Sequence, residues 1–178
     1  MRGVAALAVA ALALAAGTEA AVSRAAVAPC RGKALAASFA VVPGSAGAGN
    51  IVYILRVRNR TLRTCFVSGL PRLGLLGRTG AALPTHPFPE HLGALAAVQV
   101  VLRPGAYASA SARFTPDVPG PGEPTNGPCE PVATRLRVTP QPGGGTIIAA
   151  IVPPTRVCVH GRMTVSGFVA GKNGALVR

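Results

Sequence analysis

Apolar and polar residues alternate over short stretches of this chain, and turns rich in Gly and Pro separate the stretches. Residues 107–114 show the pattern most clearly: every second position from Ala108 to Phe114 is apolar and is expected to face inward. The residues between them, Ser109, Ser111 and Arg113, are expected to face outward. Similar stretches occupy 35–42, 51–57, 62–67, 72–76, 97–102, 132–138, 146–152 and 157–169. No stretch beyond the N-terminal segment has a convincing helical period. The pattern therefore predicts an all-β domain, an antiparallel β-sandwich of about eight strands.

Residues 50–76 hold the most informative group of predicted strands. The β-branched run 51–57 is interrupted by a turn at Asn59, and a second run, 62–67, contains Cys65. The Gly-Leu-Pro sequence at 69–71 then turns the chain into a third run. A cysteine on one of two neighbouring strands, followed by such a corner, indicates a sandwich held by a disulfide.

The N-terminus has the features of a secretory signal peptide. Arg2 precedes an apolar run over 4–16, and small residues follow at Thr18 and Ala20. The run is short for a bilayer span. We expect a signal peptide over 1–20, a linker over 21–29, the sandwich over 30–169 and a C-terminal tail over 170–178. Cleavage after Ala25 and retention as an anchor are alternatives.

Export makes the protein secreted or otherwise extracytoplasmic, and it determines how the four cysteines are interpreted. A lipid anchor at Cys30 is not expected, because Pro29 stands where a lipoprotein signal needs Gly or Ala. In an oxidising compartment, four cysteines imply two disulfides, with three possible pairings. Pairing of neighbouring segments favours Cys30–Cys65 and Cys129–Cys158. Loops of this length contribute roughly 3.5–4 kcal/mol each in the chain-entropy model.

The charge is strongly positive: 18 Lys and Arg residues stand against five Asp and Glu, giving +13. Such an excess attracts anionic polymers or lipid head groups. Alternation places Arg56 and Arg58 on one face of a strand, and Arg135 and Arg137 on one face of another. The two pairs form one anion-binding patch if their strands share a sheet. If the strands lie in different sheets, the pairs only solubilise them.

Motifs for catalysis are missing from the sequence. There is no G-x-S-x-G elbow, no phosphate-binding Gly-rich loop with Lys and Ser or Thr, and only one Asp. No aromatic residues are interleaved with the basic ones, so nucleic acid is not an expected partner. The sequence thus favours a binding module of the cell envelope without enzymatic activity or cofactor. One alternative is a copper or zinc protein using His86 and His91 in the proline-rich loop 84–93. A hydrolase with an unrecognised site is another.

A set of motifs in a fixed order resembles a known family. The motifs are Cys30, the Asn59 turn, Cys65 with Ser68-Gly69-Leu70-Pro71, Gly80, Leu102-Arg103-Pro104-Gly105, Pro128-Cys129, Leu136-Arg137-Val138-Thr139-Pro140 and Val157-Cys158. Over 30–169 the chain is similar to the actinobacterial exported family catalogued as domain of unknown function 4232. That resemblance implies an immunoglobulin-like sandwich with two disulfides, often in secreted or lipid-anchored envelope proteins. It implies no activity.

Overall fold

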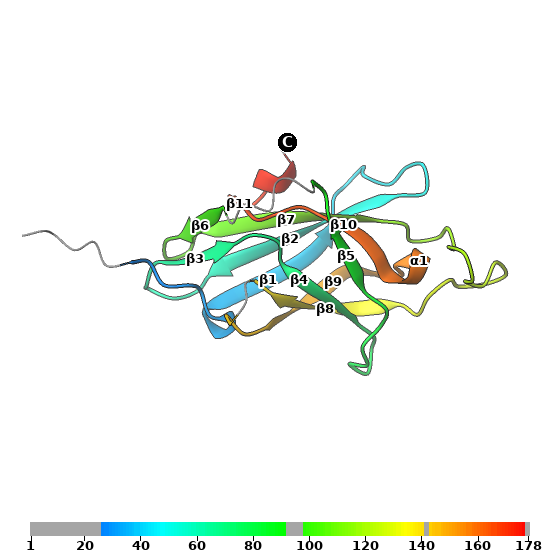
Figure 1. The fold of residues 1–178 in the computed structure, drawn as a ribbon, viewed down its shortest axis with the longest axis horizontal. Helices are drawn as coiled ribbons and strands as arrows, with labels where there is room; N and C mark the ends of the chain where they lie inside the picture. Colours follow the sequence, from blue (N-terminus) through cyan, green and yellow to red (C-terminus); the bar gives the residue numbers. More distant parts are fainter. Residues whose placement is uncertain (1–25, 92–97, 141–142, 177–178) are drawn as a thin grey trace, which may run out of the picture.

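The computed structural model describes residues 26–91, 98–140 and 143–176, so the expected signal peptide lies outside the described residues. Strands dominate this part of the chain (Figure 1). They are β1 (Leu35–Val41), β2 (Ile51–Asn59), β3 (Cys65–Ser68), β4 (Arg72–Leu76), β5 (His86–Pro89), β6 (Gln99–Leu102), β7 (Tyr107–Phe114), β8 (Ala133–Thr139), β9 (Ile147–Thr155), β10 (Arg162–Val165) and β11 (Val169–Ala170). The helical pieces are single turns: η1 (Gly32–Ala34), α1 (Cys158–Gly161) and η2 (Gly174–Leu176). The all-β prediction is confirmed.

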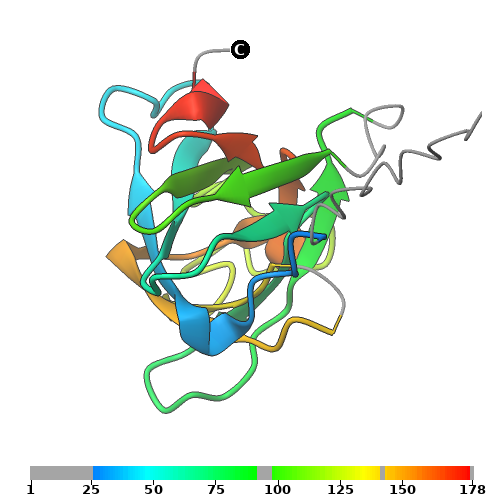
Figure 2. The same ribbon diagram turned by 90° about the vertical axis from the view of Figure 1, so that its left-hand side faces the viewer.

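One large sheet surrounds the core. Its strand order is β4-β8-β9-β1-β2-β7-β10-β5, with β11 also paired to β7. In the view along the long axis, strands lie on every side of the interior (Figure 2). A second, two-stranded sheet of β3 and β6 packs against the same core through Val67, Val100 and Leu102. The prediction of an antiparallel arrangement is wrong in two places, because β1 pairs with β9 and β10 pairs with β5 in parallel.

The core consists mainly of the inward positions that the alternation predicted. On β7, Ala108, Ala110 and Ala112 are buried. Tyr53 lies between Phe39 and Phe114, with ring centroids 5.1 and 5.2 Å away. The Tyr53 hydroxyl donates a hydrogen bond of 2.9 Å to the Pro153 carbonyl. This aromatic row supplies the bulk that tryptophan gives to many sandwiches, since the chain has none.

Both expected disulfides are present. Cys30–Cys65 joins the start of the domain to β3, and Cys129–Cys158 joins a long loop to α1. Backbone hydrogen bonds support the first connection, because the Cys30 amide donates to the Phe66 carbonyl and the Phe66 amide donates to the Ala28 carbonyl. Each disulfide thus connects neighbouring segments, as the spacing favoured.

The proline-rich segment predicted as a loop contains a strand instead. β5 pairs in parallel with β10, with His86 opposite Arg162 and Phe88 opposite Thr164. The Glu90 amide donates to the Val165 carbonyl, so the backbone amides of even-numbered residues in this segment point towards β10. Pro87 and Pro89 are odd-numbered, so their nitrogens lie on the free side of this edge strand, where no amide donor is needed. Edge position is therefore what reconciles the prolines with a strand.

The segment expected to be a C-terminal tail packs against β7 over its described part. β11 pairs with β7, and the Ala175 amide donates to the Ser109 hydroxyl. Ser109 is fully buried under this cover, although the alternation placed it on the solvent side. Arg56 donates to the Asn173 side chain at 2.7 Å and to the Lys172 carbonyl.

Candidate functional site

The predicted arginine pairs lie in one sheet but on strands that are not neighbours. β9 and β1 stand between β8, with Arg135 and Arg137, and β2, with Arg56 and Arg58. β1 and β9 are joined through only two register pairs, at Phe39 and Ala40. The structure therefore keeps each pair together and does not bring the two pairs into cross-strand contact.

Three of these four guanidinium groups already have partners within the protein. Arg56 binds the C-terminal segment, and Arg58 donates to the Gly105 carbonyl and lies 5.6 Å from the centre of the Tyr107 ring. Arg135 donates to the Arg78 carbonyl at 2.9 Å. Arg137 is exposed and makes no hydrogen bond or ion pair with another described residue. The acceptors bound by Arg56, Arg58 and Arg135 are uncharged, so they do not neutralise the positive charge of these side chains.

A second pair of arginines borders a pocket of about 150 Å³ at one end of the sheet. Arg113 lies near the end of β7, and Arg162 begins β10. Arg113 is opposite Thr164, which places Arg162 at the diagonal position, about 7–8 Å away along the sheet. The lining residues are Asn50, Arg113, Phe114, Thr115, Val159, Arg162, Met163 and Thr164. None of them is acidic, so the pocket is basic and rich in hydrogen-bond donors.

One wall of this pocket is the turn labelled α1, which has an unusual backbone. Val159 and His160 have φ values of 59° and 55°, in the left-handed region. β-Branched residues such as valine rarely adopt this region, and the strain costs of order 1–3 kcal/mol for each residue. Val159 lines the pocket from this turn. The wall therefore depends on whatever stabilises the left-handed conformation.

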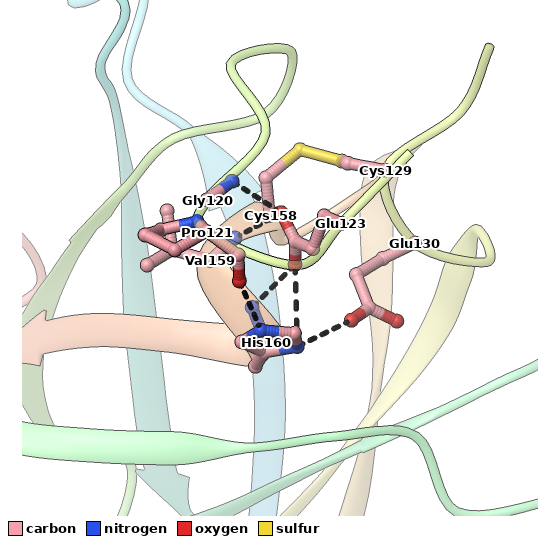
Figure 3. A network of polar contacts seen from close by, with 8 residues as sticks. All are labelled: Gly120, Pro121, Glu123, Cys129, Glu130, Cys158, Val159 and His160. Atoms are coloured by element: carbon pink, nitrogen blue, oxygen red, sulfur yellow. Dashed lines mark hydrogen bonds and ion pairs between the residues drawn. A yellow bond between two sulfur atoms is a disulfide. The ribbon is translucent and has the colours of Figure 1, made fainter. Parts of the chain in front are cut away.

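The carboxylate of Glu123 holds the turn in place (Figure 3). It accepts hydrogen bonds from the backbone amides of Gly120 at 2.6 Å, Val159 at 2.9 Å and His160 at 2.5 Å. Glu123 comes from the irregular loop between β7 and β8 and is buried, with 7% of its surface exposed. Because successive left-handed residues point their amides the same way, one carboxylate can satisfy both. The Cys129–Cys158 disulfide ties the loop to the turn beside it.

Burial and hydrogen bonding act in opposite directions on Glu123. Burial raises the pKa of the carboxyl, but the amides of His160, Gly120 and Val159 and the His160 ring together lower it to about 2. Burial also raises the pKa of Glu130, and the neighbouring Glu123 carboxylate raises it further. His160 lies between them, with Nδ1 at 3.8 Å from Glu123 and 3.7 Å from Glu130. Its Nε2 lies 3.0 Å from the Pro121 carbonyl.

This network fits a structural role better than metal binding. Glu123, Glu130 and His160 could each offer a ligand atom within 4.8 Å of the others. However, both Glu123 oxygens already accept backbone amides. The other potential cluster contains Cys129 and Cys158, whose sulfurs are joined to each other. Among the described residues neither cluster includes the predicted metal ligands, because His86 lies on β5 and His91 follows that strand.

Sequence reasoning placed Arg113 on an outward face but did not connect it with Arg162. The two residues are far apart in the chain, and nothing local shows that β7 and β10 pair. Glu123 gave a weaker signal: it stands between Gly122 and Pro124 in a segment that predicts only a loop. The one available hint was Cys129 beside Glu130, since a disulfide there must bring this loop to Cys158.

The fold and site define a disulfide-stabilised all-β domain with a basic pocket at one end. The chain belongs to the family described as Domain of unknown function (DUF4232), whose family model matches residues 30–169. No curated protein and no solved structure matches this chain. No helix among the described residues is long and apolar enough to cross a membrane.

Proposed function

We propose that this protein is an exported binding module of the cell envelope that is not an enzyme. Its domain is an immunoglobulin-like sandwich, and it contacts an acidic polymer or lipid head group through arginine. One observation carries the proposal: every ion pair among the described residues involves His160, so no described Arg or Lys is neutralised by a carboxylate. A surface with this much uncompensated charge attracts anions over a distance set by the salt concentration.

Export is the first part of the proposal to test. We expect the mature protein to begin near Ala21, because the apolar run 4–16 suits a cleaved signal peptide. The intact mass of the protein recovered outside the cytoplasm measures this directly. A mass that includes residues 1–20, or that carries acyl chains at Cys30, would contradict cleavage without lipidation.

Binding is the second part. The mature protein should be retained on vesicles containing phosphatidylglycerol and on an acidic cell-wall polymer at low salt. At physiological salt it should be released, because a Debye length of about 8 Å screens exposed charges. Neutral phosphatidylcholine vesicles and an uncharged polysaccharide serve as controls. Equal retention on neutral and anionic supports would refute the proposal. So would a lack of retention on every anionic support.

The arginine pairs of β2 and β8 need their own variant. Changing Arg56, Arg58, Arg135 and Arg137 together to Gln removes four positive charges, so elution should shift to lower salt. If retention is unchanged on both supports, these four residues are ordinary surface. Binding must then reside elsewhere on the molecule.

A further inference from the structure

We propose that the pocket between β7, β10 and α1 is a specific site for a phosphoryl group, held by Arg113 and Arg162. This inference rests on the proposed function and names the chemistry of its ligand. It differs from a general charge effect, because it assigns recognition to two of the many arginines. The pocket was not among the sites that the sequence predicted.

The two guanidinium groups are available to a ligand. Neither forms a hydrogen bond or ion pair with another described residue. Arg162 lies over the Phe88 ring, with its guanidinium carbon 4.8 Å from the ring centre. That cation–π contact helps to orient the side chain and does not occupy its N–H groups with a hydrogen-bond acceptor. Arg113 is exposed and stands diagonally opposite on the next strand.

The donors around the pocket match an anion with several oxygens. Arginine presents a planar fork that binds phosphate oxygens in pairs, and charge-assisted hydrogen bonds of this kind are the strong ones. The hydroxyls of Thr115 and Thr164 make no side-chain hydrogen bond with described residues and can add donors. A phosphate monoester offers three free oxygens, and a phosphodiester two, to the two forks on different strands. No Asp or Glu lines the pocket. Glu123, which binds the Val159 amide, is buried, and both of its oxygens already accept backbone amides.

The size and rigidity of the pocket also fit a compact group. A volume of about 150 Å³ holds several waters or one phosphoryl group. Two walls are fixed by the paired strands β7 and β10. The third is Val159, on the turn that Glu123 and the Cys129–Cys158 disulfide hold. The backbone that carries the lining side chains is therefore ordered before a ligand binds, which lowers the entropic cost of binding.

Titration of the mature protein with inorganic phosphate tests the site directly. Amide chemical shifts in NMR spectra, recorded at constant ionic strength, should change saturably around Arg113, Val159 and Thr164. The Arg113→Gln/Arg162→Gln variant should bind phosphate about tenfold more weakly, a change of about 1.4 kcal/mol. Arg60→Gln/Arg63→Gln is the matched control, because it removes the same charge from two exposed arginines in the loop after β2. The control should bind within about twofold of the wild type.

A second variant separates the positive charge from the guanidinium forks. Arg113→Lys/Arg162→Lys keeps the charge and removes the forks, so it should also bind phosphate more weakly than the control variant. Shifts spread over all basic surfaces, no saturation, or equal weakening in the control variant would overturn the site. So would full phosphate binding by the lysine variant.

Vesicles and polymer separate the possible sources of the phosphoryl group. Loss of retention by the Gln variant on vesicles containing phosphatidic acid, but not on immobilised poly(glycerol phosphate), identifies a lipid head group. The reverse identifies a polymer. If the wild type is retained on both supports and the Gln variant is retained as strongly as the wild type on each, the pocket is refuted and the binding module stands. A wild type retained on neither support refutes the module itself.

Discussion

Replacing Glu123 with alanine should lower the free energy of unfolding by on the order of 3–5 kcal/mol at neutral pH. The variant leaves the amides of Gly120, Val159 and His160 without their common acceptor, in a part of the protein where Glu123 itself is buried. It also removes the negative charge that favours the left-handed turn. Urea unfolding with the disulfides intact measures the change.

The contribution of Glu123 should depend on pH in a defined direction. Its folded-state pKa of about 2 lies below the ordinary 4.5, so the folded protein holds the carboxylate better than the unfolded chain does. The stability it provides is therefore complete above about pH 4.5 and is lost as the pH falls towards 2. Glu123→Gln should lose this part of the acid dependence.

Glu130→Gln is the matched control, because it removes a carboxylate from the same cluster. The pKa of Glu130 is raised, so ionising this group costs more in the folded protein than in the unfolded chain. We expect the free energy of unfolding at neutral pH to change by less than about 1 kcal/mol or to increase. A loss as large as that of Glu123→Ala would show that general charge around His160, and not the three amide bonds, stabilises the turn.

Replacing Gly161 with alanine should be about as damaging, at roughly 3–5 kcal/mol. A Cβ atom at this position would collide with the Pro84 carbonyl oxygen, and the backbone has φ of +75°. Both the segment that leads into β5 and the left-handed turn must move to make room. Thermal unfolding should show a lower midpoint, and phosphate binding should weaken because Val159 moves with the turn.

Gly44→Ala separates the two causes of that loss. Gly44 has φ of +73°, nearly the same as Gly161, but a Cβ there has no neighbour within 4 Å. This variant should cost only the conformational penalty of about 1–2 kcal/mol. If Gly161→Ala costs no more than Gly44→Ala, the close approach of Pro84 has no energetic weight, and the packing around α1 is looser than described.

The sequence was sufficient for the parts of the fold that local patterns determine. Alternation identified the buried faces of β2 and β7, since the side chains of a strand change face at every residue. The spacing of the cysteines favoured the correct disulfides. Prediction from local sequence patterns failed at β5, where Pro87 and Pro89 remove the usual signs of a strand. Only the neighbouring β10 explains why a strand forms there.

The candidate site was harder to predict because it depends on distant contacts. Arg113 and Arg162 become neighbours through strand pairing, and Glu123 acts on amides that are presented by an uncommon backbone conformation. Valine in the left-handed region contradicts its own preference. The residue types around Val159 do not predict its left-handed conformation, because the strain is compensated by a carboxylate that is distant in the sequence.

The two disulfides lie towards opposite ends of the long axis of the molecule. The described segment before Cys30 lies at one end, and α1 lies at the other (Figure 1). The pocket belongs to the α1 end, because Val159 of α1 lines it. Any attachment through the N-terminal segment would therefore hold the pocket about one domain length from the point of attachment.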